Sequence, residues 1–224
     1  MTATKLLRLD NASFIYPASQ SKKYSSLYRM SVTLSEPVDA TVLQLALEAT
    51  VARIPTFGHT LTGGALWWYL RPLGKSPRVL PLQPLHQFSI AGNGGFLFRV
   101  SPGGAHIVLD VFHVLTDGHG GMTFLLTLTA EYLRLRYGVQ PLYGGMILDP
   151  TQAPCASEIA DAFDDFAGKW GALERNDPAW HIHGRPLGTK ELRNLHVRIP
   201  MTRIAEIARA RQVTVTELLA AALV

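Results

Sequence analysis

Residues 96–138 constrain the fold of this 224-residue chain more than any other stretch. Two short apolar runs, Phe96–Val100 and His106–His113, flank residues 101–104 (Ser-Pro-Gly-Gly), a typical turn sequence, so the pattern predicts an antiparallel hairpin. From about residue 120 to 137 the apolar side chains recur every three or four positions, which is helical spacing, and a glycine follows. The sequence therefore predicts a strand that leads through a tight connection into a long helix.

The candidate catalytic residue lies at the end of that strand. His113 shares the more uniformly apolar face of the strand with Ile107, Leu109 and Val111. An imidazole titrates near neutrality and accepts a proton from a hydroxyl, amine or thiol, so His113 is a candidate general base. We expect Asp117 to hold the turn, through backbone amides or by pairing with an arginine, and Gly118 to permit a backbone geometry or close approach that a β-carbon would block.

Other sites near the turn are less favoured. A histidine at a strand end beside a glycine-rich turn is more often structural than catalytic. Five residues could be imagined as a metal site: His106, Asp110, His113, Asp117 and His119. Their spacing is not HExxH, and His106 and His113 differ in parity, so they point to opposite faces of an ideal strand. The sequence lacks the G-x-S-x-G elbow that would indicate a serine hydrolase. Binding of an anion such as a CoA phosphate by the glycine-rich turn of residues 118–121, at the start of the helix, is a secondary possibility.

The remaining chain alternates strand and helix signals. Residues 28–34 alternate like a half-buried strand, and residues 41–53 read as a buried helix that stops near Pro55. An aromatic strand over residues 65–70 holds two adjacent tryptophans, which we expect to pack in the core rather than to line a ligand groove. We expect a solvated acidic helix face over residues 157–170 and an exposed loop around His181 and His183. A strand is expected over residues 194–200, followed by two helices, the second with Thr214 and Thr216 as candidate caps.

Composition limits the broad class. Hydrophobic residues make up 47% and charged residues 17% of the chain, as in globular proteins rather than disordered ones. The net charge of +4 at pH 7 comes from scattered Lys and Arg, so no nucleic-acid role is indicated. The single Cys155 excludes an intrachain disulfide and favours a reducing compartment. Without a secretory signal or a membrane-length apolar run, we expect a cytoplasmic protein with no membrane partner.

At the strand end the sequence resembles a known family. Residues His113 to Gly118 read His-Val-Leu-Thr-Asp-Gly and match the HxxxDG signature of the chloramphenicol-acetyltransferase-like superfamily. This superfamily includes alcohol acetyltransferases and plant acyltransferases, polyketide-associated transferases and peptide-synthetase condensation domains. The earlier order of strand, acidic turn, helix and Arg-Ile-Pro is also similar to the superfamily's opening. Condensation domains carry a second histidine directly before the first, whereas this chain has Phe112.

The resemblance implies an α+β fold: a mixed-sheet sandwich whose helices pack on a mostly antiparallel sheet, as in the superfamily's N-terminal lobe. It implies acyl transfer from a CoA or carrier-protein thioester to a hydroxyl or amine acceptor. In that reaction His113 is the general base, Asp117 and Gly118 support the site, and acyl-CoA is a co-substrate. No permanently bound cofactor and no metal are implied, and the residues that would hold the donor are unassigned.

The resemblance also predicts the domain organisation. Residues 1–195 correspond to the N-terminal acyltransferase-like lobe, and residues 196–224 to the start of a truncated second lobe, because the last apolar helix has no stop signal. The superfamily's DFGWG-type motif, which lies in its second half, does not occur here. We therefore expect the isolated chain to be inactive. We also expect its exposed half-interface to bind either a second copy of the chain, as a homo-oligomer, or the missing C-terminal lobe. The alternative is a non-catalytic binding or structural lobe that needs a second half or a partner chain.

Overall fold

The structure is a computed structural model that describes residues 6–10, 12–20, 26–64, 67–158, 183–184, 187–188, 191, 193 and 196–223. The chain forms two compact units, Met1–Trp170 and Gly171–Val224. The predicted acidic helix over 157–170, except its first two residues, and His181 lie outside the described residues.

The main sheet of the first unit contains the predicted hairpin. Its three strands are antiparallel in the order β2 (Leu27–Thr33), β6 (His106–Phe112) and β5 (Phe98–Gly103). Strand β5 continues through the first three of the four residues expected to turn, so only Gly104, at a φ of 67°, and Ala105 separate the two strands. The hairpin is confirmed, with a tighter turn than the sequence indicated.

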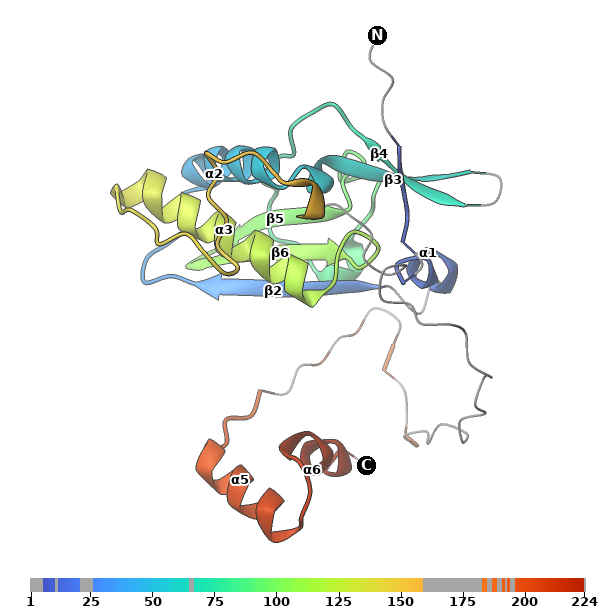
Figure 1. The fold of residues 1–224 in the computed structure, drawn as a ribbon, viewed down its shortest axis with the longest axis vertical. Coiled ribbons are helices and arrows are strands. Elements are labelled where there is room, and N and C mark those ends of the chain that lie inside the picture. Colours follow the sequence, from blue (N-terminus) through green and yellow to red (C-terminus); the bar gives the residue numbers. More distant parts are fainter. Residues whose placement is uncertain are drawn as a thin grey trace. The chain divides into compact units, whose positions relative to one another are not determined.

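Two helices cover one face of this sheet (Figure 1). Helix α2 (Ala40–Arg53) begins at Asp39, whose carboxylate accepts the amides of the first turn. Helix α3 (Gly118–Tyr137) ends at Gly138, which adopts a φ of 69° that a side chain would disfavour. Both helices are confirmed, and with the antiparallel sheet they give the predicted α+β fold.

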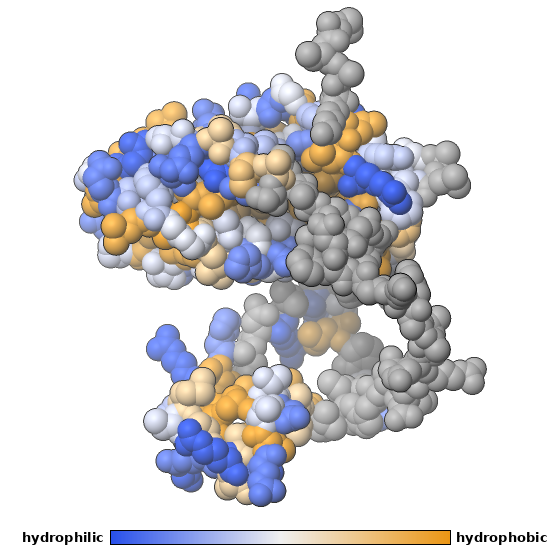
Figure 2. Space-filling model, viewed as in Figure 1, coloured by the Kyte–Doolittle hydropathy of each residue, from blue (hydrophilic) through white to orange (hydrophobic). Residues whose placement is uncertain are grey.

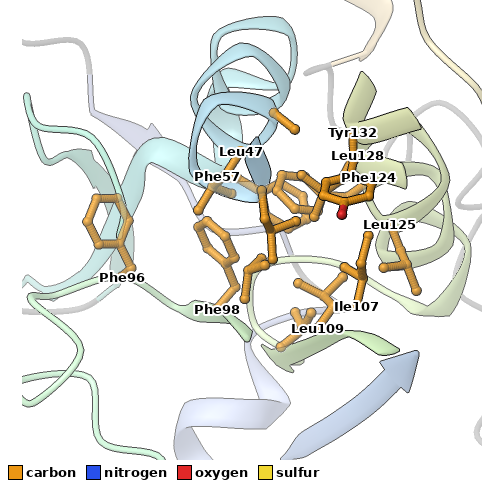
Figure 3. Close-up of a cluster of buried hydrophobic side chains, with 14 residues drawn as sticks. Leu47, Phe57, Phe96, Phe98, Ile107, Leu109, Phe124, Leu125, Leu128 and Tyr132 are labelled. Carbon is orange, nitrogen blue, oxygen red and sulfur yellow. The ribbon is translucent and has the colours of Figure 1, made fainter. Parts of the chain in front are cut away.

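The core lies between the helices and the sheet (Figure 3). Phe57, which follows α2, stacks on Phe124 of α3 with ring centres 3.9 Å apart and meets Phe98 of β5 edge-on at 5.1 Å. Leu47 and Leu109 are fully buried beside them. Each such side chain contributes roughly 1.5–3 kcal/mol when it leaves water, so this layer holds β6 and α3 rigidly on either side of the turn.

A second small sheet lies beside the first. Its order is β1 (Leu7–Arg8), β4 (Trp68–Pro72) and β3 (His59–Gly63), and all pairings are antiparallel. The predicted aromatic strand is thus formed as β4. Trp68 packs against a second core cluster, as expected, but Trp67 is only half-buried and lies under the Arg8 guanidinium, 3.8 Å from its ring centre. The short helix α1 (Ile15–Ser19) completes this region.

The described part of the second unit is helical. Helices α5 (Met201–Ala210) and α6 (Val215–Ala221) are confirmed, and Thr214 caps α6 in a reciprocal pair with Glu217. The strand predicted over 194–200 is wrong where the structure describes it, at residues 196–200, because no described segment pairs with it. Apolar side chains reach the surface here (Figure 2): Val197, Ile199, Met201, Ile207, Val213, Leu219 and Leu223.

Candidate active site

His113 follows the last residue of β6, and the turn that it opens leads into α3. Its backbone amide donates to the carbonyl of Ser26 at 2.8 Å, which extends the pairing of β6 with the segment before β2. Its side chain is half-buried. The candidate base is therefore held at its backbone by the sheet and is partly accessible at its ring.

Two tyrosine rings contact the imidazole. Tyr16 of α1 stacks on it with ring centres 4.2 Å apart and planes inclined by 15°. Tyr28 of β2 meets it edge-on, with ring centres 5.0 Å apart and an angle of 65°. Tyr28 pairs with Val111 of β6, so the sheet register places its ring beside the strand end. Together the two rings limit the orientations that the imidazole can take.

One imidazole nitrogen is buried without a hydrogen bond. Within the described residues, Nδ1 of His113 has no partner. Buried polar atoms nearly always have one, and leaving such an atom unpaired costs roughly 1–3 kcal/mol. In the described structure, then, the ring is oriented by aromatic packing rather than by a hydrogen bond to Nδ1.

Asp117 fixes the turn through backbone amides, the first of the two alternatives. Its Oδ1 accepts the amide of Gly120 at 2.8 Å, so the carboxylate caps α3. Its carbonyl accepts the amide of Gly121 at 3.0 Å and the hydroxyl of Tyr28 at 2.8 Å. No arginine pairs with Asp117 in the part of the chain that the structure describes.

The tyrosine hydroxyl at this turn remains a donor. Burial, and then the charge of Asp117 and the proximity of Tyr16, raise the pKa of Tyr28 well above its usual value of 10.0. The phenol is therefore protonated throughout the neutral range, and its hydroxyl donates a hydrogen bond to the Asp117 carbonyl.

The expected reason for Gly118 is wrong. A β-carbon there would meet only the Met30 Cε, at an ordinary 3.8 Å, and its φ lies outside the left-handed region. The glycines that the turn requires follow it. A β-carbon on Gly120 would collide with the Thr116 hydroxyl, and one on Gly121 would lie 2.5 Å from the Tyr28 hydroxyl. Sequence reasoning selected the glycine of the motif and missed the two that limit space.

A cavity of about 850 Å³ opens beside His113, within the range of small-molecule sites. Its apolar walls come from β1 and the residues just after it, the segment after α2, β4, the motif turn and the segment after α3: Leu7, Leu9, Ala12, Ile54, Phe57, Leu70, Val114, Leu115 and Leu148. Polar side chains also line it, including Arg8, Asp10, Ser13, Thr56, Thr116, His119, Thr123 and Glu158. His113, Tyr16 and Asp117 all border this space.

Two members of the hypothetical metal set, His106 and Asp110, are not brought to His113. Asp110 lies on the opposite face of the sheet, where it forms ion pairs with Arg29 at 2.6 Å and Arg99 at 2.5 Å. The ring nitrogen Nδ1 of His106 lies 3.0 Å from the Thr33 hydroxyl. Only His119 borders the same cavity as His113 and Asp117. The difference follows from strand parity, as the sequence indicated.

Residues near the N-terminus are the main omission of the sequence prediction. No motif marks residues 7–16, yet they supply one wall of the cavity and the ring that stacks on His113. The apolar cluster Phe14-Ile15-Tyr16-Pro17 was the available signal. Its contact with a residue almost one hundred positions later depends on tertiary packing, which local periodicity does not encode.

No protein-family profile matches the chain. No curated protein matches it either. Solved structures do. Polyketide synthase associated protein 5 from Mycobacterium tuberculosis is 20% identical over 69% of this chain and 38% of that one, with a TM-score of 0.45. The X-domain in its complex with OxyB from teicoplanin biosynthesis is 17% identical over 69% and 36%, with a TM-score of 0.49.

The starter condensation domain of rhizomide synthetase RzmA, in a mutant form complexed with C8-CoA, is 15% identical over 62% of this chain and 38% of that one, with a TM-score of 0.46. These structures include condensation-domain and polyketide-associated proteins, groups named by the sequence resemblance. The chain spans well under half of each structure's length. Among the described helices, none is both long and apolar enough to cross a bilayer.

Proposed function

We propose that the protein is an acyltransferase that moves an acyl group from a CoA or carrier-protein thioester to a hydroxyl or amine, with His113 as general base. One observation carries the proposal: the motif histidine lies at a rigid strand end, stacked on Tyr16, and borders a cavity large enough for a small-molecule substrate. A structural histidine would need no such opening.

The chemistry follows from the position of the imidazole. His113 accepts the proton of the acceptor hydroxyl or amine while the acceptor's oxygen or nitrogen attacks the thioester carbonyl. A tetrahedral oxyanion forms, its C–S bond breaks as the carbonyl is restored, and the imidazolium returns the proton to the leaving thiolate. The products are an ester or amide and a free thiol, so atoms and charge balance.

The cavity walls favour a largely apolar guest. Nine apolar side chains border the space, and burying a methylene group beside such walls is worth about 0.8 kcal/mol. An acyl chain or the hydrocarbon part of the acceptor is the natural occupant, and the reacting atoms would lie toward His113 and the motif turn.

The domain proposal belongs to the same hypothesis. Residues 1–195 form an N-terminal acyltransferase-like lobe, and residues 196–224 begin a second lobe whose remainder, or a partner chain, completes the site. The exposed apolar residues of the 196–223 region support this, because such side chains are usually covered in an assembled protein. On this proposal the 224-residue chain alone does not turn over.

The test measures free thiol released from short- and medium-chain acyl-CoA thioesters in the presence of a panel of alcohols and amines. The assay compares the 224-residue chain with the full polypeptide in which it occurs. We expect turnover by the full polypeptide and a loss of about 10²- to 10⁴-fold in kcat for His113→Ala. Circular dichroism checks that this variant keeps its fold.

Two results would each overturn one part of the proposal. Equal turnover by the folded His113→Ala variant would remove the base assignment, and turnover by the purified 224-residue chain would remove the need for a second half. If the full polypeptide binds an acyl thioester but releases no thiol, the alternative of a non-catalytic binding lobe holds instead.

A further inference from the structure

Tyr28 touches both parts of the proposed catalytic turn. Its ring lies edge-on to His113 at 5.0 Å between ring centres, and its hydroxyl donates to the Asp117 carbonyl at 2.8 Å. The same hydroxyl lies 3.3 Å from the Thr116 carbonyl. One rigid side chain on β2 thus connects the start of α3 to the edge of the imidazole.

Gly121 makes this arrangement sterically feasible. A β-carbon at Gly121 would lie 2.5 Å from the Tyr28 hydroxyl, 3.1 Å from its Cε2 and 3.2 Å from its Cζ. Because β2 and α3 are both fixed by the core, a methyl group at this position would push on the tyrosine whose ring contacts His113. The second glycine after the motif therefore sets how closely the tyrosine approaches the helix.

We infer that Tyr28 is a positioning residue that holds the His113 imidazole in its productive orientation, and that Gly121 leaves the space that the tyrosine needs. This role rests on the proposed function. The hydroxyl acts as the anchor and the ring as the contact. The unpartnered Nδ1 of His113 makes this contact consequential, because within the described residues no hydrogen bond to that nitrogen holds the ring.

The test uses three variants and a matched glycine control. Tyr28→Phe removes the anchor and keeps the ring, Gly121→Ala pushes on the hydroxyl, and the third variant combines the two. Gly92→Ala is the control, because a β-carbon there meets only Ser89, no closer than 3.5 Å. For the protein that releases thiol, we expect Tyr28→Phe and Gly121→Ala to lower kcat about tenfold or more with KM nearly unchanged.

The double variant separates positioning from simple loss of structure. Once the hydroxyl is absent, the nearest atom in the path of the methyl group that Gly121→Ala introduces is gone. We therefore expect this substitution to have a much smaller effect in the Tyr28→Phe background than alone. Multiplicative losses would contradict the inference. If Gly121→Ala fails to fold, Tyr28→Phe alone decides, because an unchanged kcat in that folded variant also contradicts it.

A second measurement does not depend on turnover. The NMR signals of the His113 ring, assigned by their loss in His113→Ala, should shift or broaden in Tyr28→Phe and Gly121→Ala and stay in place in Gly92→Ala. Unchanged ring signals in folded Tyr28→Phe would overturn the positioning role. Absence of thiol release from every protein, wild type included, would instead overturn the proposed function and leave this measurement to decide the contact.

Discussion

The two faces of strand β6 contact different kinds of residue at the centre of the strand. Toward the helices, Leu109 and its neighbours of the same parity are fully buried among apolar side chains. Toward the other side, Asp110 is 1% exposed and lies between Arg29 and Arg99, one from each neighbouring strand. One seven-residue strand therefore carries an apolar core on one face and a buried charge cluster on the other.

The difference shows what each face can do. Apolar packing is non-directional and holds β6 against α2 and α3 wherever shapes fit. The charge cluster is directional, because each arginine must meet a carboxylate oxygen, and it fixes the register of three strands. His113 has the same parity as the apolar residues of β6 and lies where the strand ends and the cavity begins. The chemistry is thus proposed where the packed face ends.

Removing the buried carboxylate tests the charged face most severely. In Asp110→Ala two arginines lose their shared partner, and Arg99 is only 4% exposed, so an uncompensated charge remains buried. We expect a loss of about 3–5 kcal/mol in the free energy of unfolding, measured by urea titration with circular dichroism. A loss below that of Val108→Ala on the same face would show that the cluster does not contribute more than packing.

Truncating the apolar face should cost somewhat less. Leu109→Ala deletes a fully buried side chain and leaves a cavity, for an expected loss of about 2–4 kcal/mol in the same titration. Because no charge is involved, the loss should be the same at low and high salt. A strong salt dependence would mean that the substitution disturbs the ion pairs behind the strand, and the two faces would then not be independent.

The sequence predicted what depends on local pattern. Strand parity placed Leu109 and Asp110 on different faces, and apolar spacing with Gly138 bounded α3. The motif turn at His113 was also located correctly between strand and helix. These features follow from period-two and three-to-four-residue repeats, which neighbours in sequence determine.

What the sequence did not predict depends on contacts between distant segments. The stacking of Tyr16 on His113 and the space shared by Gly121 and Tyr28 join residues about ninety or more positions apart. Nothing local distinguishes Gly121 from Gly118, so the motif glycine was chosen. The strand expected over residues 194–200 is not formed at the described residues 196–200, because alternation alone does not supply a partner strand.

A partly exposed ion pair sharpens the comparison between charge and packing. Arg53 is 5% exposed and pairs with Glu158, whose side chain is 33% exposed, at 2.6 Å. Water screens one partner, so we expect Glu158→Gln to cost only about 1 kcal/mol, well below the loss from the buried cluster. A cost as large as that of Asp110→Ala would break the link between burial and energy.

The same pair predicts a pH dependence. The hydrogen bonds from Arg53 lower the pKa of Glu158 below its ordinary 4.5, so the folded state holds the proton less tightly than the unfolded state. The stabilisation is fully present above about pH 4.5 and is lost as the pH falls through the lowered pKa. The stability gap between wild type and Glu158→Gln should therefore narrow in acid. A gap independent of pH would contradict the pairing.

The smallest change in stability is expected from a substitution at Gly118, which lies beyond the end of β6. Gly118 begins α3 with a φ outside the left-handed region, and a β-carbon there meets only Met30 Cε at 3.8 Å. Gly118→Ala should therefore change the free energy of unfolding by no more than about 0.5 kcal/mol, since alanine also favours helix. Gly121→Ala, three residues on, should cost clearly more. If the two substitutions cost the same, the space beside Tyr28 is not what limits this turn, and the glycine of the motif regains the role that the structure assigns to its neighbour.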